Sequence, residues 1–188
     1  LLSVPGIGPE KADCLASRAE DAFPGARIVH RLDRDTSGVI IMARDADAHR
    51  ELSRQFQDRE VEKHYEALVG GCLAIDDGVI DAPIRKDLDH PPRQVIDEER
   101  GRSATTHFKV LVRGTDHTHV ELKPVTGRSH QLRLHMQSIG HPILGDDLYA
   151  PDHLVEASPR LMLHATILTV KHPATGEDVT FHDPCPFS

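Results

Sequence analysis

The sequence predicts an α+β fold in which a largely antiparallel mixed sheet is flanked by a few helices. Several segments alternate apolar and polar residues with the period of a half-buried strand. Turns of hairpin length separate most of these segments, and only a few stretches have the apolar spacing of a helix. Because the 188 residues contain no internal repeat, low-complexity tract or Gly/Ser linker, one domain is expected.

The first third of the chain is expected to contain two helices and one buried strand. A Gly-rich turn at 4–9 precedes a helix-like segment at 11–20. The β-branched run from Gly38 to Ala43 follows turn residues and is typical of a buried strand. Asp45 is suited to cap a helix that ends near Arg59, since apolar residues recur there at helical spacing.

The rest of the chain is expected to form strands and one further helix. Alternating patterns predict strands over 64–69, 106–112, 119–123, 161–167 and 179–181. The polar, proline-containing stretch from 76 to 102 lacks such a pattern and is expected to be an irregular excursion. Ser129 is suited to cap a helix that Gly140 ends and that Pro142 cannot continue.

Composition indicates a globular protein of a reducing compartment. Apolar residues make up 38% of the chain, and no apolar run approaches the roughly 18 residues that a membrane-spanning helix needs. The three cysteines form no CxxC pair, which argues against a disulfide framework and a cysteine-based zinc ribbon. The first six residues have no signal-peptide features, so a cytoplasmic location is expected.

The net charge of −8 argues at first sight against a nucleic-acid partner, whose phosphates attract lysine and arginine. The charge is unevenly distributed, however. Segments 1–25, 64–84 and 172–188 contribute −2, −4 and −3, which leaves +1 for the remainder of the chain. A basic groove in that remainder is therefore compatible with the composition.

The richest block of polar residues runs from His30 to Gly38 and places Asp33 between Arg31 and Arg34, just before an apolar strand. A cation within about 4 to 6 Å would hold a carboxylate ionised, and an ionised carboxylate can serve as nucleophile or base. A solvated turn capped by Asp33 or Asp35 explains the same spacing without any catalysis.

A second block, from Gly127 to Met136, opens a helix with several cationic and hydrogen-bonding side chains. Backbone N–H groups at a helix start suit a phosphate. On such a helix Arg133 shares a side with Ser129. An ordinary surface helix that carries Arg128 and Arg133 explains the block equally well.

Two other patterns point to different functions. Val4 to Pro9 resembles the hairpin of helix-hairpin-helix DNA-binding modules, but one isolated hairpin accounts for nothing downstream. The 14 histidines invite a metal interpretation, above all His117 with His119 and His130 with His135. Zinc needs three or four converging ligands. The sequence contains neither an HExxH motif nor a set of histidines that a carboxylate would complete as a zinc site. No metal site is therefore predicted.

Five ordered blocks together resemble the motifs of the RluA family of pseudouridine synthases. The blocks are HRLDRDTSG at 30–38, KHYEA at 63–67, GRSHQLRLHM at 127–136, HPILGDDLY at 141–149 and RLMLHA at 160–165. The start of the chain is most similar to the branch that acts on transfer RNA and 23S ribosomal RNA. Compared with that family, the chain begins after a strand and a Lys-Pro motif, so residues 1–188 are expected to be an N-terminally truncated catalytic domain.

The resemblance implies the pseudouridine synthase fold with a central catalytic cleft, and cofactor-free conversion of uridine to pseudouridine in RNA. It assigns the catalytic carboxylate to Asp33, which would attack the sugar or remove a proton from C2′. Arg133 stands at the ion-pairing position that would keep this carboxylate charged, with Arg128 as the alternative. Tyr65 would stack on the uracil and take part in removing the proton from C5, although a half-buried strand aromatic explains it too.

The resemblance also implies residues that bind RNA. Arg31 would fill the gap that an extruded base leaves, because its planar guanidinium can both stack and donate hydrogen bonds. Arg128 would bind phosphate, and Leu163 would form an apolar wall against the uracil. His30 and Thr36 lie in the aspartate motif and complete the predicted RNA-binding set.

The expected partner is a structured RNA, either a transfer RNA anticodon stem-loop or 23S ribosomal RNA. The protein is expected to be a monomer that needs no membrane and no obligatory protein partner. Two other functions stay open at this point. A noncatalytic RNA-binding remnant would recognise RNA without changing it, and a nucleoside hydrolase would release free uracil.

Overall fold

The computed structural model describes residues 1–6, 8 and 12–187, and it divides into two compact units. Unit 1 comprises Leu1–Lys63 and Ala165–Pro184, and unit 2 comprises His64–His164 and the residues from Cys185 onward. Short helices accompany strands that pair mostly antiparallel, which confirms the predicted α+β class. Residues 7 and 9–11 lie outside the described residues, so they leave the helix-hairpin-helix pattern at 4–9 without a structural account.

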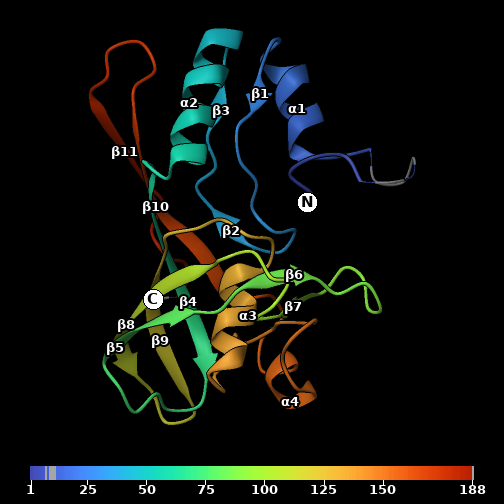
Figure 1. Ribbon diagram of the computed structural model, residues 1–188, viewed down its shortest axis with the longest axis vertical. Helices are drawn as coiled ribbons and strands as arrows, with labels where there is room; N and C mark the ends of the chain where they lie inside the picture. The colour runs from blue at the N-terminus through green and yellow to red at the C-terminus, as the bar shows by residue number, and fades with distance from the viewer. Residues whose placement is uncertain (7, 9–11, 188) are drawn as a thin grey trace. The chain divides into compact units, whose positions relative to one another are not determined.

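Unit 1 contains two helices and several short strands (Figure 1). Its elements are α1 (Leu15–Ala22), β1 (Arg27–Ile28), β2 (Ser37–Gly38), β3 (Met42–Ala43), α2 (Ala46–Asp58), β11 (Asp178–His182) and most of β10 (Leu163–Lys171). Helix α2 packs beside β1 and β3. A core of buried apolar residues joins it to β10, formed by Ala43, Leu52, Val61, Leu168 and Val170.

The predicted helix after Asp45 is confirmed. The Asp45 carboxylate accepts the N–H of Ala48 at 2.8 Å, which satisfies one of the unpaired donors at the start of α2. The helix ends where Arg59 adopts the left-handed conformation, with a φ of 61°. On its buried side, the amide of Gln55 donates to and accepts from the backbone of Lys171, with both bonds at 2.9 Å.

The single strand predicted over Gly38–Ala43 is wrong. The segment forms two separate strands, because Gly38 has a φ of 109° and interrupts the extended backbone. Strand β2 pairs with β10, and the N–H of Val39 donates to the carbonyl of Ala165 at 2.9 Å. Strand β3 pairs instead with β1, antiparallel.

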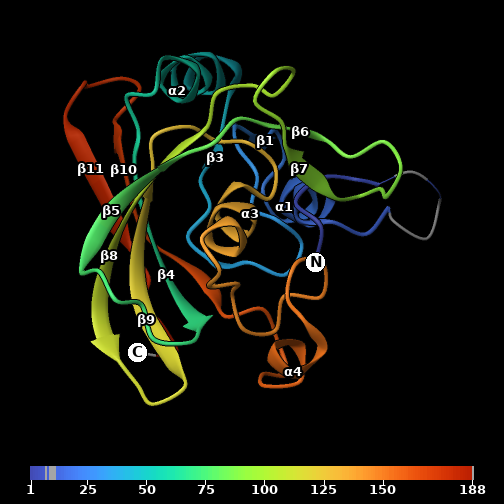
Figure 2. The same cartoon turned by 60° about the horizontal axis from the view of Figure 1, so that its bottom comes forward.

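Unit 2 is built on an antiparallel layer in the order β4-β9-β8-β5 (Figure 2). Its elements are most of β4 (Glu62–Gly70), β5 (Asp77–Asp81), β6 (Ile84–Lys86), β7 (Gln94–Ile96), β8 (Thr105–Arg113), β9 (His117–Pro124), α3 (Gln131–Ser138) and α4 (Asp152–Val155). Leu132 and Met136 of α3 share a core with Ala67 and Leu122 of the strands, so α3 covers one face of this layer. The strands predicted over 106–112 and 119–123 are confirmed as β8 and β9, which pair antiparallel.

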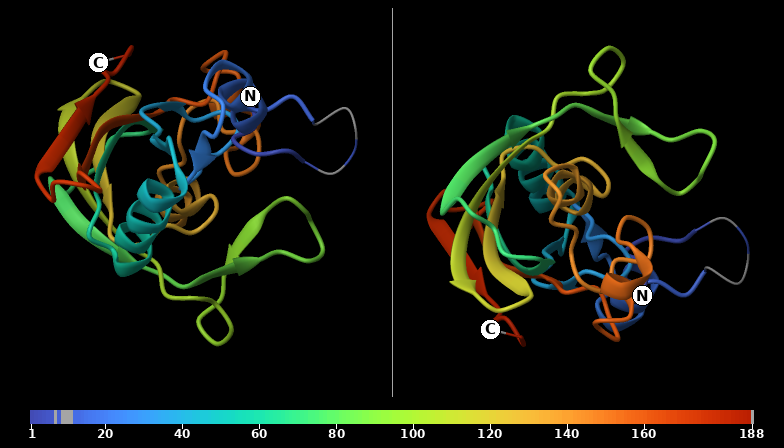
Figure 3. Two further views of the ribbon diagram at one scale, coloured as in Figure 1. Left: turned by 90° about the horizontal axis from the view of Figure 1, so that it is seen from above. Right: turned by 90° about the horizontal axis from the view of Figure 1, so that it is seen from below.

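The excursion predicted from 76 to 102 is wrong in part, since it contains three strands. Strand β5 pairs with β8, and β6 and β7 form a separate two-stranded ribbon that extends from the side of unit 2 (Figure 3). Their patterns are weak for physical reasons. In β5 only Ile80 is buried while Val79 is exposed, and β6 and β7 have three residues each. Within the described residues, no helix is long and apolar enough to cross a bilayer.

Candidate active site

Asp33 lies on the loop that connects β1 to β2 in unit 1, and its side chain is half-buried. The N–H of Thr36 donates to the Asp33 carbonyl at 3.0 Å and closes a turn behind the carboxylate. On the other side, the Ser3 hydroxyl donates to the Leu32 carbonyl at 2.9 Å and accepts the Leu32 N–H at 3.2 Å. These bonds fix the backbone on both sides of Asp33.

Two arginines flank the predicted catalytic residue, and they differ in their environment. The Arg34 guanidinium pairs with the neighbouring carboxylate of Asp35, with Nη2 2.8 Å from Oδ2. The side chain of Arg31 is exposed to solvent on the same loop. Arg31 is thus available to an external partner, as the prediction of a base-replacing residue requires.

His30 supports this loop from inside unit 1. Its ring stacks on Phe56 of α2 with centroids 4.4 Å apart, and its Nε2 accepts the N–H of Ile41 at 3.1 Å. Burial, aided by the positive charge of Lys63, lowers the pKa of His30 from 6.5 to about 4. A neutral imidazole with an unprotonated Nε2 agrees with that hydrogen bond. His30 therefore holds the loop next to Arg31 in place.

Gly38 ends the same loop and lies directly against the backbone of β10. A Cβ placed on Gly38 would stand 2.2 Å from the carbonyl oxygen of Ala165, and the φ of 109° is one that other residues rarely adopt. Only glycine fits this contact. The glycine of the first motif thus lets the Asp33 loop enter the sheet.

The second predicted block begins differently from expectation. The residue that precedes α3 is His130, with a φ of 55° and no side-chain capping bond, so the prediction that Ser129 caps the helix is wrong. The buried amide of Gln131 holds the turn that precedes the helix. Its Oε1 accepts the N–H of Arg128 at 3.0 Å and the hydroxyl of Thr126 at 2.8 Å. Ser129 is exposed.

Arg133 occupies the buried side of α3 and forms an ion pair that the sequence did not reveal. Its Nε donates to Asp146 at 2.8 Å, and its Nη2 donates to both Asp146 and Asp147. The Asp146 side chain is fully buried and also accepts the N–H groups of Leu148 and Tyr149, each at 3.0 Å. Asp146 thus fixes both the guanidinium and the loop after residue 145.

Tyr149 completes this cluster in unit 2. The Arg133 guanidinium lies 5.3 Å from the centre of the tyrosine ring, an arrangement that permits a cation–π contact. The hydroxyl accepts the N–H of Gln94 at 2.8 Å and hydrogen-bonds to Nδ1 of His130, also at 2.8 Å. Both Asp146 and Tyr149 lie in the HPILGDDLY block. The signal was in the sequence, but the block alone did not show which partner each residue holds.

The other predicted residues of unit 2 are Tyr65, Leu163 and Arg128, and they differ in burial and in contacts. Tyr65 is half-buried on β4, opposite Leu122 of β9, and packs against the main core. Leu163 belongs to that core and is only 2% exposed. The Arg128 side chain is partly exposed, and its Nε donates to the carbonyl of Ser103 at 3.1 Å. The structure describes Asp33, His30, Arg31 and Thr36 in unit 1 and the remaining predicted residues in unit 2.

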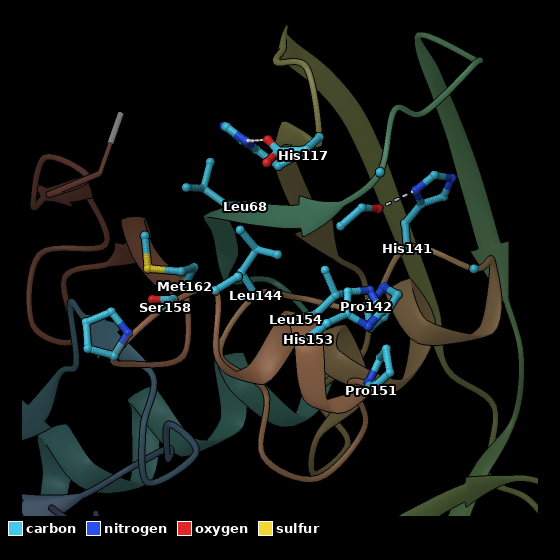
Figure 4. A pocket seen from close by; sticks show the side chains of 16 residues that line it. Leu68, His117, His141, Pro142, Leu144, Pro151, His153, Leu154, Ser158 and Met162 are labelled. Atoms are coloured by element: carbon cyan, nitrogen blue, oxygen red, sulfur yellow. Dashed lines mark hydrogen bonds and ion pairs between the residues drawn. The ribbon is translucent and has the colours of Figure 1, made fainter.

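A broad pocket of about 910 Å³ also lies in unit 2 (Figure 4). Leu68, Leu144 and Met162 give it an apolar lining, and three histidines stand at its walls. His117 pairs with Asp116 at 2.8 Å, and His141 hydrogen-bonds to the Gly70 carbonyl at 2.8 Å. None of the described residues that line it was predicted for catalysis or RNA binding.

Comparison with known proteins supports the motif-based interpretation. Residues 6–138 match a family model described as RNA pseudouridylate synthase. The protein named "Dual-specificity RNA pseudouridine synthase RluA" of Haemophilus influenzae is 50% identical over 183 residues, which cover 97% of this chain and 84% of that protein. The protein of the same name from Escherichia coli K12 is 47% identical over 188 residues, covering 100% of this chain and 86% of the relative.

Two solved structures share the fold. "Human RNA Pseudouridylate Synthase Domain Containing 1" aligns with a TM-score of 0.81 and 33% identity, covering 93% of this chain and 75% of the human chain. "Human RNA Pseudouridylate Synthase Domain Containing 4" aligns with a TM-score of 0.76 and 26% identity, covering 99% of this chain and 83% of the other. The sequence and fold comparisons therefore point to the same group of enzymes.

Proposed function

This chain belongs to the RluA family of RNA pseudouridine synthases, and we propose that Asp33 is the carboxylate with which it isomerises uridine to pseudouridine. The observation that carries the activity is 47–50% identity over almost the whole chain to enzymes named for this reaction. The position of Asp33 on a loop with a hydrogen-bonded backbone supports the choice of residue. The protein is an RNA pseudouridine synthase.

The reaction explains why a single carboxylate is sufficient. The N1–C1′ bond of uridine breaks, the uracil turns, and C5 then bonds to C1′ while the proton on C5 is lost and N1 gains one. No atom enters or leaves overall. Glycosidases usually use a second carboxyl group because they must activate water, and this isomerisation uses no water. Asp33 acts either by attacking C1′ or by removing the proton from C2′, and both routes require it to be ionised.

Base extrusion sets a second requirement. A uracil inside a stacked helix is inaccessible to Asp33, and unstacking it costs a few kcal/mol. We propose that Arg31 enters the vacated position, because its exposed guanidinium stands two residues before Asp33 and can stack and donate hydrogen bonds together. His30 and Thr36 contribute to RNA binding by holding this loop, through the bonds to Ile41 and to Asp33.

Three residues of unit 2 receive roles in the same proposal. Tyr65 stacks on the uracil and takes part in removing the C5 proton. Leu163 is proposed to form an apolar wall against the uracil. Arg133 is proposed as the cation that keeps the catalytic carboxylate ionised, in addition to its ion pair with Asp146.

The substrates proposed for this chain follow from its relatives' names. Those enzymes are called dual-specificity RNA pseudouridine synthases. We propose that this protein likewise modifies a transfer RNA anticodon stem-loop and 23S ribosomal RNA, and that Arg128 contacts the phosphate backbone. We further propose that it works in the cytoplasm as a monomer.

The test compares purified protein on two RNAs made without modifications, a transfer RNA and a 23S ribosomal RNA fragment. Pseudouridine is mapped in each after incubation with the native chain, Asp33→Asn and Asp47→Asn. Asp47 is a matched control, because it is a highly exposed aspartate on α2. We expect product with the native chain and Asp47→Asn, and a loss of more than about 10²-fold with a folded Asp33→Asn.

The alternatives give different results in this assay. RNA binding by the native chain without product would favour a noncatalytic remnant, and free uracil would favour a hydrolase. Full turnover by Asp33→Asn would remove Asp33 from the mechanism. Product on only one of the two RNAs would overturn dual specificity while leaving the activity intact.

A further inference from the structure

Three side chains of different chemistry meet in unit 2 away from the residues discussed so far. They are Glu66 on β4, His119 on β9 and Cys185 near the C-terminal end, and their ligand atoms all lie within 4.8 Å of one another. His119 is 8% exposed and Cys185 is 9% exposed, while Glu66 is half-buried. A carboxylate, an imidazole and a thiol thus share one enclosed place.

The antiparallel pairing of β4 with β9 brings Glu66 and His119 together. His119 faces Leu68 in the antiparallel β4–β9 register, and Glu66 lies two residues before Leu68. Side chains two residues apart in a strand point to the same face, so Glu66 and His119 are diagonal neighbours there. The C-terminal end of the chain lies beside β9 in Figures 1 and 2, and the ring of Phe187 contacts that of His119 at a centroid distance of 6.4 Å. The last residues therefore bring Cys185 to this face.

One atom of the group is unsatisfied. Nε2 of His119 is buried and has no hydrogen-bond partner among the described residues. It lies 2.8 Å from Oε2 of Glu66, which is an ion-pair distance only when the imidazole is protonated, and it forms no hydrogen bond there. Buried ring nitrogens are normally paired, so an orphaned one beside a carboxylate and a thiol requires a further ligand or a special role.

We propose that Glu66, His119 and Cys185 bind a Zn²⁺ ion, with water as the fourth ligand. Sulfur, imidazole nitrogen and carboxylate oxygen are the donors that zinc takes in tetrahedral sites. The charges also balance, because a thiolate and a carboxylate offset the two charges of the ion and leave a neutral buried centre. The Cys185 thiol gives up its proton to solvent on binding.

The positions of the three ligands in the chain would make the ion a cross-link. The three ligands come from two neighbouring strands and from the C-terminal segment, so the ion would fasten that segment to the β4–β9 face. None of the three ligands is among the residues given a role in catalysis or RNA binding. Zinc binding can therefore be measured whether or not RNA is modified.

The experiment uses the full chain without an affinity tag, purified under reducing conditions, loaded with Zn²⁺ and then freed of weakly bound metal by gel filtration. Zinc is measured by elemental analysis in the native protein and in Cys185→Ser, Glu66→Gln and Cys72→Ser. Cys72 is a matched control, since it is an exposed cysteine outside the group. We expect about one zinc per chain in the native protein and in Cys72→Ser, and at least about a tenfold loss of affinity in the other two.

Cobalt gives a second readout that does not depend on folding stability alone. Co²⁺ bound through a thiolate shows a sulfur-to-metal charge-transfer band, which we expect in the native chain and in Cys72→Ser but not in Cys185→Ser. Circular dichroism confirms that each variant is folded. The proposal is overturned if the native chain retains no more zinc than Cys185→Ser, if folded Glu66→Gln binds zinc as well as the native chain, or if Cys72→Ser loses the metal.

Discussion

Arg133 and Asp146 form a buried ion pair in unit 2, with Nε of the arginine 2.8 Å from Oδ2 of the aspartate. The arginine side chain is 4% exposed and the aspartate side chain is fully buried. Two buried charges are stable only when each compensates the other and when their remaining polar atoms form hydrogen bonds. The N–H groups of Leu148 and Tyr149, which donate to the same carboxylate, meet that condition.

Removing one partner of this pair should destabilise the protein strongly. We expect Asp146→Asn to lower the free energy of unfolding by about 3 to 5 kcal/mol, because the substitution leaves the Arg133 charge buried with weaker compensation. The control is Asp147→Asn, since Asp147 also contacts Arg133 but its side chain is 51% exposed. That variant should lose about 1 kcal/mol or less. Urea unfolding measures both, and equal losses would contradict this account.

The stability of the protein should depend on the protonation of His30. The pKa of His30 is about 4 in the folded state and near 6.5 when it is unfolded. Between these pH values the unfolded chain binds more protons, so the free energy of unfolding falls as the pH drops from about 6.5 to 4. The loss attributable to His30 amounts to about 3 kcal/mol.

A neutral variant isolates this effect. His30→Gln keeps an acceptor for the N–H of Ile41 but cannot take up the proton. We expect the difference in unfolding free energy between the native chain and His30→Gln to shrink as the pH falls from about 6.5 to 4. The measurement is chemical denaturation at a series of pH values. A constant difference across the range would show that His30 titrates normally.

Gly38 should tolerate no side chain. Alanine there would place a Cβ 2.2 Å from the Ala165 carbonyl oxygen, at a φ that already disfavours it. We expect Gly38→Ala to lower the free energy of unfolding by more than about 2 kcal/mol. Gly176→Ala is the control, because Gly176 also has a positive φ but a Cβ there would meet nothing within 4 Å. Thermal denaturation should show the larger loss at position 38.

Arg31→Lys tests the proposed replacement of the extruded base. Lysine keeps the charge but loses the flat guanidinium that stacks, so we expect kcat/KM for pseudouridine formation to fall about tenfold or more. The control is Arg50→Lys, because Arg50 lies on the exposed surface of α2. Unfolding curves of both variants should match the native chain. Unchanged kcat/KM in Arg31→Lys would exclude a stacking role.

The salt dependence of RNA binding tests the proposed phosphate contact of Arg128. If the RNA backbone is bound by cations, affinity falls as salt rises, even though the net charge of the chain is −8. We expect Arg128→Gln to reduce the slope of log K against log salt by about 1. The control is Arg18→Gln. Arg18 is an exposed arginine of α1 that pairs with Asp13, and its replacement should leave the slope unchanged. A flat response of the native chain would contradict phosphate binding.

Some elements of the structure could be predicted from the sequence, and others could not. The helix over Ala46–Asp58 was predictable because its capping aspartate and apolar spacing are local features. Strand β5 was not, since it is an edge strand with one buried residue, and its assignment depends on pairing with a distant strand. The Ser129 cap failed for a related reason. Gln131 instead holds the turn before α3 through bonds to Thr126 and to Thr105, and Thr105 is 26 residues away in the chain.

The sequence by itself determined the family, the order of the motifs and the identity of the candidate carboxylate, because these are recorded in residue types at fixed spacing. Only the tertiary structure decided that Arg133 is bonded to Asp146, that His30 is buried and neutral, and that Glu66, His119 and Cys185 meet. Each of these depends on contacts between residues that are distant in the chain, or on loss of water around them. Burial and long-range pairing are properties of the packed chain and leave no short pattern in the sequence.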